Sequence, residues 1–161
     1  MAGSFPSVET LVPHRELMLL LTAVQELAGD CIVCLGAVPL DHPLVDQSRA
    51  PAILGVELAA QAAAAHERLR GTGGAAGWTE SDLGYLVSIS ECRFSSPSVT
   101  AGQRLRATVR LVGSAGPLCV YRGIVEMAED RGQIVACRFS TYRVNRARAR
   151  ESRTTDEASG V

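Results

Sequence analysis

The alternation of hydrophobic and polar positions divides the chain into segments typical of strands and one long segment typical of a helix. Residues 16–28 are mostly apolar, and β-favouring isoleucine and valine resume over residues 31–39. Gly29 and Asp30 interrupt the pattern between them, as in the turn of a hairpin. The N-terminal part is therefore predicted to form two antiparallel strands.

A third apolar segment, residues 52–70, is too long for a strand and predicts a helix. It follows Pro51, which suits the first turn of a helix, and it ends at the glycine-rich residues 71–74. The segment is apolar on nearly every side, so it is either buried in a domain or inserted in a membrane. Glu57, Gln61, His66 and Glu67 interrupt its apolar surface. Because of these residues, we expect a buried helix and no membrane partner.

The residues after Gly84 have the pattern of four successive strands. The predicted strands cover residues 85–94, 104–112, 118–127 and 133–144, with turns at residues 114–117 and 130–132. From residue 146 the sequence is polar and rich in arginine, so residues 146–161 are expected to form a flexible charged tail. One domain is therefore expected over residues 1–145.

Two strands, one buried helix and four strands make an α+β order. One helix cannot cover both faces of a flat six-stranded sheet. A curved antiparallel sheet that wraps around the helix and pairs with a second such subunit solves that problem. Alanines at positions 59, 60 and 62–65 support this arrangement, because small side chains allow the sheet to approach the helix closely.

Composition narrows the classes of function. The chain has 161 residues, of which 47% are hydrophobic, and this is enough for one well-packed domain. A net charge of −1 disfavours a nucleic-acid partner, since nucleic-acid binders present a strongly basic face. The start of the chain carries neither a charged leader nor an apolar stretch, so a cytoplasmic location is expected.

The five cysteines do not predict a metal site or a disulfide. Cys31 and Cys34 are three residues apart on a predicted strand, so their side chains point to opposite faces. No second pair of cysteine or histidine residues stands at a spacing typical of zinc sites. We therefore expect reduced structural thiols and no metal.

Glu57 is the residue that points most directly to chemistry. It lies inside the apolar helix, where a carboxylate is costly unless it is paired, protonated or functional. Gln61, four residues later, lies on the same face and can orient the carboxyl group. Burial is expected to raise the pKa of Glu57, as a general acid requires. A pairing with a buried arginine, or a position facing solvent, is the structural alternative.

Two motifs resemble the 3-hydroxyacyl-ACP dehydratases, where ACP is acyl carrier protein. They are Pro-His-Arg-Glu-Leu-Met-Leu-Leu-Leu from Pro13 and Pro-Ala-Ile-Leu-Gly-Val-Glu-Leu-Ala-Ala-Gln-Ala from Pro51. The likeness is greatest to the aryl-polyene-type branch and extends in outline from Val8 to Tyr142. It implies a hotdog fold, in which a curved antiparallel sheet wraps around one long central helix. It also implies conversion of 3-hydroxyacyl-ACP to trans-2-enoyl-ACP, without a cofactor, in fatty acid, polyene or type II polyketide biosynthesis.

The resemblance also implies roles for individual residues. The helix carboxylate, here Glu57, helps to expel the hydroxyl group, and Gln61 orients it. The backbone N–H of Ala52 would hold the thioester carbonyl, because free N–H groups at a helix N-terminus favour negative charge on that oxygen. Gly55 is assigned to substrate binding together with Ala52. His14, in the first motif, is expected to be structural or close to the site.

The histidine that acts as the base in these enzymes has no clear counterpart. Typical members carry it in a Gly-His-x-x-Gly loop before the carboxylate, and at that separation this chain has Pro43. His66 lies on the opposite side of the helix from Glu57. Either His42 substitutes as the base, or the base comes from another chain.

A second subunit is the interpretation that we prefer for the missing base. In the aryl-polyene branch, the partner of the acid-bearing subunit is a second hotdog protein that supplies the histidine. The resemblance therefore implies a hetero- or homodimer of hotdog subunits. The other implied partner is an acyl carrier protein with a phosphopantetheine-linked acyl chain.

Two other functions are compatible with the same residues. Some hotdog thioesterases use a helix carboxylate to activate water, so an acyl thioesterase is the first alternative. The second is a catalytically silent subunit that shapes the acyl site or binds carrier protein. The product formed from a 3-hydroxyacyl-ACP would distinguish a dehydratase from a thioesterase, and a change of Glu57 to Gln would test the silent subunit.

Overall fold

A computed structural model of the chain describes residues 5–71 and 82–145. The tail predicted over residues 146–161 lies outside the described residues. The elements in chain order are α1 (Val8–Leu11), η1 (Glu16–Met18), β1 (Leu21–Ala28), β2 (Cys31–Gly36), β3 (Arg49–Pro51), α2 (Leu54–Gly71), β4 (Asp82–Phe94), β5 (Ser98–Thr100), β6 (Leu105–Ala115), β7 (Leu118–Met127) and β8 (Gln133–Asn145).

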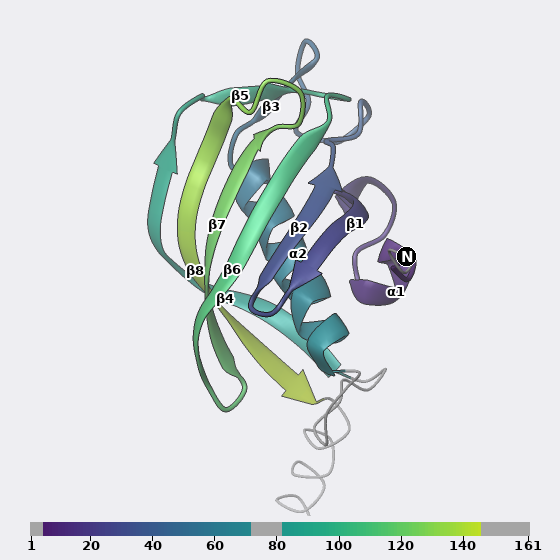
Figure 1. Ribbon diagram of the computed structural model, residues 1–161. Helices are drawn as coiled ribbons and strands as arrows, with labels where there is room; N and C mark the ends of the chain where they lie inside the picture. The colour runs from purple at the N-terminus through teal and green to yellow at the C-terminus, as the bar shows by residue number, and fades with distance from the viewer. Residues whose placement is uncertain (1–4, 72–81, 146–161) are drawn as a thin grey trace, which may run out of the picture.

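Six strands form one antiparallel sheet in the order β1-β2-β6-β7-β8-β4. The sheet curves around α2, which lies along its concave side (Figure 1). β3 and β5 form a separate two-stranded sheet. This arrangement is the hotdog fold, so the predicted α+β architecture with one central helix is confirmed.

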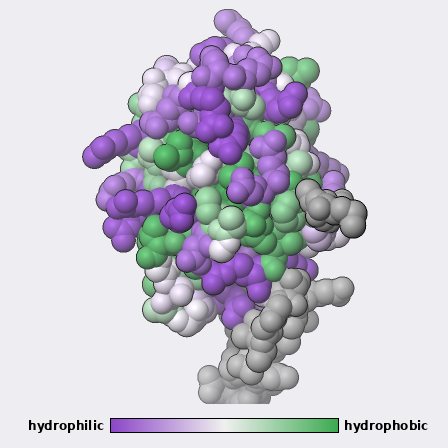
Figure 2. All heavy atoms as spheres, viewed as in Figure 1, coloured by the Kyte–Doolittle hydropathy of each residue, from purple (hydrophilic) through white to green (hydrophobic). Residues whose placement is uncertain are grey.

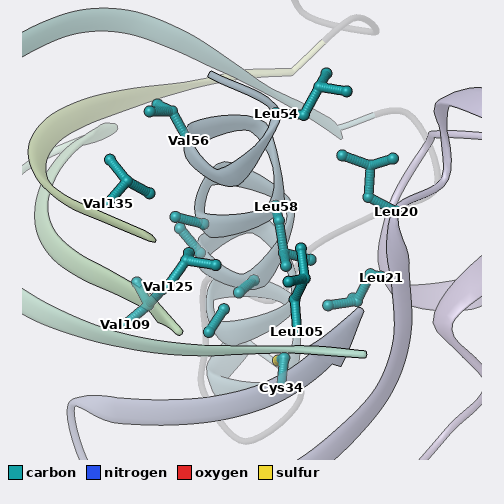
Figure 3. Close-up of a cluster of buried hydrophobic side chains, with 14 of the residues drawn as sticks. Leu20, Leu21, Cys34, Leu54, Val56, Leu58, Leu105, Val109, Val125 and Val135 are labelled. Atoms are coloured by element: carbon teal, nitrogen blue, oxygen red, sulfur yellow. The ribbon is translucent and has the colours of Figure 1, made fainter. Parts of the chain in front are cut away.

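The core lies between α2 and the inner face of the sheet. Alternate residues in the first half of β6 and in the middle of β7 and β8 are buried on the side of the helix, as the two-residue period of a strand requires. Figure 3 shows valines of three strands converging on leucine and valine side chains of α2. The fully buried residues at this contact include Leu58, Ala59, Ala62, Val109, Val125 and Val135. Alanines on α2 therefore allow the close approach that the sequence predicted.

The outer face of the sheet is mixed in character. Figure 2 shows hydrophobic groups on the surface among hydrophilic ones on the side seen in Figure 1. Val112 of β6 and Ile124 of β7 are among the exposed hydrophobic side chains. Scattered exposure of this kind is ordinary for a soluble domain.

The predicted hairpin is present, with differences at its start. β1 pairs with β2 around Gly29, which has a φ of +56° that glycine adopts without strain. Residues 16–18, predicted as part of the first strand, form the 3-10 turn η1 instead.

The start of the central helix also differs from the prediction, because Pro51 lies in β3 rather than in the first turn of the helix. Pairing of β3 with β5 holds the chain extended there, so α2 begins at Leu54.

The five cysteines are free in this structure. Cys34 is buried, and Cys31 is partly exposed. Burial raises the pKa of the Cys34 thiol to about 12, so it stays protonated and unreactive. Among the described residues, no group of three histidine, cysteine or acidic side chains is placed to hold a metal ion. Over the same residues, no helix has the length and apolar character needed to cross a membrane.

Gly55 lies where α2 packs tightly against the sheet. A Cβ atom at this position would stand 2.8 Å from Val135 Cγ1 of β8. We expect Gly55→Ala to lower the free energy of unfolding by about 1–3 kcal/mol, because the strain of overpacking exceeds the gain in helix propensity. Urea unfolding would measure the change. Gly113→Ala is the control, since no atom lies within 4 Å of a Cβ there, and an equal loss in both variants would contradict the packing argument.

Candidate active site

The carboxyl group of Glu57, in the first turn of α2, has two side-chain partners. Gln61 Nε2 donates to Glu57 Oε1 (2.9 Å), and His14 Nε2 lies 3.1 Å from the same oxygen. The side chains of His14 and Glu57 are 32% and 28% exposed. Glu57 therefore lies at the edge of the interior, and no arginine pairs with it among the described residues. The contact with His14 is the part of this cluster that the sequence did not predict.

Gln61 is fully buried and connects Glu57 to the N-terminal segment. Its Oε1 accepts hydrogen bonds from the backbone N–H groups of Leu20 (3.0 Å) and Leu21 (3.1 Å). Its Nε2 donates to the backbone oxygen of Met18 (2.8 Å) as well as to Glu57. Both Nε2 protons and the amide oxygen are thus used. This anchoring holds α2 against the segment that follows His14.

The pKa of Glu57 lies below its ordinary value in this structure, which corrects the expectation that burial would raise it. The largest cause is the hydrogen bond from His14, followed by burial, which acts in the opposite direction. The hydrogen bond from Gln61 lowers the pKa further. Both donors stabilise the charged form of the carboxyl group, and together they outweigh its desolvation.

Replacing His14 by Leu is expected to raise the pKa of Glu57, because the largest stabilising contact disappears while burial remains. His14→Gln retains a donor and should raise the pKa less. A ¹³C NMR titration of the Glu57 carboxyl carbon would measure both shifts. Since the folded pKa is depressed, the ionised carboxylate stabilises the fold above the ordinary pKa and loses this effect as pH falls through the lowered pKa. Equal carboxyl titrations in the wild type and His14→Leu would contradict the assignment.

The backbone N–H of Ala52, which was expected to hold the thioester carbonyl, already has an acceptor in this structure. The Ala52 N–H donates to the oxygen of Pro97 (3.0 Å), so this amide is occupied in the structure. The N–H of Gly55 donates to Ala52 (2.9 Å), in the tight first turn of the helix. Among the described residues, no hydrogen-bond acceptor is found for the amides of Ile53 and Leu54. These two are the amides free to bind a ligand at this helix end.

His42 is not brought into contact with Glu57. It is 4% exposed, and its Nδ1 accepts a hydrogen bond from the N–H of Leu44 (3.1 Å). Its Nε2 is buried, and no hydrogen-bond partner for it is present among the described residues. His66 is also buried and contacts Tyr121 and Gly29 rather than Glu57, as the helical period predicted.

A pocket of about 210 Å³ lies beside Glu57 and His14. It follows one face of α2 and is covered by side chains of β4 and β8. Its lining includes Ala60, Ala64, Glu67, Tyr85, Leu86 and Thr141. A larger pocket of about 300 Å³, which includes Arg70 and Cys119, does not contain Glu57. The smaller pocket is therefore the candidate substrate site.

Solved structures with a similar fold include dehydratase and thioesterase proteins. The dehydratase heterocomplex ApeI:P from Xenorhabdus doucetiae contains a chain that matches with 22% identity and a TM-score of 0.73, covering 91% of this chain and 97% of that one. A thioesterase from Haemophilus influenzae matches with 15% identity and a TM-score of 0.52, covering 76% and 78%. A hypothetical thioesterase with coenzyme A from Streptococcus pneumoniae matches with 11% identity and a TM-score of 0.57, covering 85% and 91%. At these identities the matches establish the fold.

The sequence comparison establishes the family. No curated protein matches the chain. The sequence model of the ApeP-like family, described as ApeP dehydratase, matches residues 6–151 and so covers most of the chain, including both motifs. The chain belongs to the ApeP-like dehydratase family.

Proposed function

We propose that the chain is the glutamate-bearing subunit of a dehydratase heterodimer that converts 3-hydroxyacyl-ACP to trans-2-enoyl-ACP. The observation that carries the proposal is the position of Glu57, which Gln61 and His14 hold at the candidate substrate pocket. Elimination of water requires a base for the proton on the α-carbon and an acid for the leaving hydroxyl group. Glu57 is the acid: it gives its proton to the hydroxyl oxygen as the C–O bond breaks, and water leaves.

The base is proposed to come from the second subunit. His14 is the imidazole in contact with Glu57 among the described residues, but its Nε2 faces the carboxyl oxygen and its Nδ1 is buried. Neither nitrogen is therefore positioned to reach a substrate α-carbon. His42 has no contact with Glu57 among the described residues. The described part of the chain thus supplies an acid without an accessible base.

The edge strand β4 supports a second hotdog subunit. β4 ends the six-stranded sheet, pairs with β8 alone, and exposes hydrophobic side chains over much of its length. These side chains are Tyr85, Leu86, Val87, Ile89 and Phe94, each between 39% and 53% exposed. A long apolar edge strand invites aggregation unless another chain covers it. Since Tyr85 and Leu86 also line the pocket, a partner on this edge would lie next to Glu57.

The thioester carbonyl is proposed to bind the free amides of Ile53 and Leu54. Both stand at the N-terminal end of α2, one turn before Glu57. Developing negative charge on the carbonyl oxygen, which makes the α-proton acidic, is stabilised by such amides. They take the role that the resemblance assigned to Ala52, whose N–H is bound to Pro97.

We propose that binding of the partner subunit and the substrate raises the pKa of Glu57, so that it can act as an acid. A general acid must carry a proton, whereas the pKa of Glu57 is lowered in the isolated chain. Burial already opposes the effect of His14, and 28% of the side chain is still exposed. Covering that part would increase desolvation and shift the pKa of Glu57 upwards.

The lowered pKa also favours one alternative function. An ionised Glu57 could act as a base that activates water, as in an acyl thioesterase.

The two functions differ in their product, so the decisive experiment is to incubate a 3-hydroxyacyl-ACP with the chain, in the presence and in the absence of its hotdog partner. Mass spectrometry should find an enoyl-ACP 18 Da lighter than the substrate by the loss of water, and only when both subunits are present. Free 3-hydroxy acid and unacylated carrier protein would support the thioesterase instead.

A further inference from the structure

The end of the pocket away from Glu57 is polar. Glu67 lies ten residues after Glu57 on α2, which places it about 15 Å further along the helix axis. Thr141 of β8 donates its hydroxyl proton to Glu67 Oε1 (2.6 Å), and both residues line the pocket. The helix surface between the two glutamates contributes the small apolar side chains of Ala60 and Ala64. The pocket therefore has an apolar middle between two carboxyl groups.

Two buried side chains, Tyr121 and His66, lie in the core near Glu67. Tyr121 and Glu67 both line the larger pocket, and the Tyr121 hydroxyl group lies 3.2 Å from His66 Nδ1. His66 Nε2 lies 3.1 Å from the backbone oxygen of Gly29. Tyr121 and His66 are both fully buried. Because Tyr121 and His66 are hydrogen bonded to each other, the positions of their protons depend on one another.

Burial of these side chains disfavours charge at this end of the pocket. The oxygen of Gly29 can only accept, so His66 carries its proton on Nε2. Burial lowers the pKa of His66, which favours the neutral ring, and Nδ1 of that ring accepts the hydroxyl proton of Tyr121. Burial also raises the pKa of Glu67 and outweighs the hydrogen bond from Thr141 and the charge of Arg143, which lower it.

We propose that Glu67 and Thr141 form a polar end of the acyl pocket that binds a hydroxyl group at the far end of the acyl chain. This inference rests on the proposed function, since it assigns the acyl chain of the substrate to the pocket beside Glu57. The Thr141 hydroxyl proton is already given to Glu67, so the lone pairs of Thr141 Oγ1 and of the carboxyl group are the free acceptors, and a hydroxyl group on the ligand can donate its proton to them. An alkyl end of the same length would remove these polar groups from water without replacing their hydrogen bonds.

A pair of substrates of equal length tests this inference. The two are 3-hydroxyacyl-ACP thioesters whose chains reach about 15 Å, one ending in a hydroxyl group and the other in a methyl group. The wild-type complex should prefer the hydroxyl end by about tenfold or more in kcat/KM, which corresponds to one hydrogen-bonded group. Thr141→Val and Glu67→Leu should reduce this ratio towards one. Glu67→Gln should retain it, because the amide oxygen can accept from Thr141 and from the hydroxyl end of the substrate. Thr22→Val, on the exposed side of β1, is the control and should keep the wild-type ratio.

A binding measurement separates this inference from the proposed function. Unreactive amide analogues of the two acyl-pantetheine chains are titrated into the full chain in a calorimeter. A preference for the hydroxyl end without any dehydration would support the polar pocket end and overturn the proposed function. Dehydration of both substrates at equal rates, with equal affinities of the two analogues, would overturn the polar end alone. A preference that survives both Thr141→Val and Glu67→Leu would also overturn it.

Discussion

Replacing Glu57 by Gln is expected to lower kcat/KM of the assembled complex for a 3-hydroxyacyl-ACP by about a hundredfold to ten-thousandfold. This is the range over which general acid catalysis contributes to enzymes. Gln has the size of Glu and its amide oxygen can still accept from His14 and Gln61, so the surroundings are retained. It cannot give a proton to the leaving hydroxyl group. The rate of enoyl-ACP formation measures the effect.

The matched control for this change is Glu26→Gln, on an exposed position of β1. It alters the net charge equally and should leave the rate of dehydration at the wild-type value. Circular dichroism and the elution volume of the complex would check that Glu57→Gln still folds and binds its partner. Unchanged turnover in a folded Glu57→Gln complex would contradict the acid role and favour the silent-subunit interpretation.

Replacing Gln61 by Leu is expected to lower the free energy of unfolding by about 3–5 kcal/mol. The change leaves the buried N–H groups of Leu20 and Leu21 without an acceptor and the oxygen of Met18 without its donor. Each buried polar group that loses its partner costs about 1–3 kcal/mol. Water cannot easily replace these bonds, because Gln61 is fully buried. Urea unfolding at neutral pH measures the loss.

Gln25→Leu makes the same chemical change at an exposed position of β1. It should change the free energy of unfolding by no more than about 0.5 kcal/mol. If the two variants lost similar stability, the four hydrogen bonds of Gln61 would not be the anchor of α2. Gln61→Leu also removes a hydrogen bond that lowers the pKa of Glu57, so that pKa should rise.

The arrangement of strands around one helix could be read from local patterns. β7 spans Leu118–Met127, the range that alternation and turn residues predict, and β8 starts at the predicted Gln133. α2 extends to Gly71, as the glycine-rich residues after Arg70 indicate. These features depend on side chains a few positions apart, whose spacing along a strand or helix is fixed by the backbone. For the same reason, Gln61 could be placed beside Glu57.

Contacts between residues distant in sequence could not be predicted in this way. His14 reaches Glu57 across 43 positions, and this contact reverses the expected direction of the Glu57 pKa. Pairing of β3 with β5 moves the start of α2 beyond Pro51 and gives the Ala52 amide an acceptor at Pro97. The periodicity of side chains along a helix does not show which residues of the sheet and of the N-terminal segment will contact that helix.

The sequence by itself therefore determined the fold class, the buried helix and the carboxyl group that carries the proposed chemistry. Only the tertiary structure decided the direction of the pKa shift of that group, the amides available at the helix start and the polar end of the pocket at Glu67 and Thr141. The physical reason is that hydrophobic patterning is local, whereas desolvation and hydrogen bonding depend on every group that the folded chain brings near.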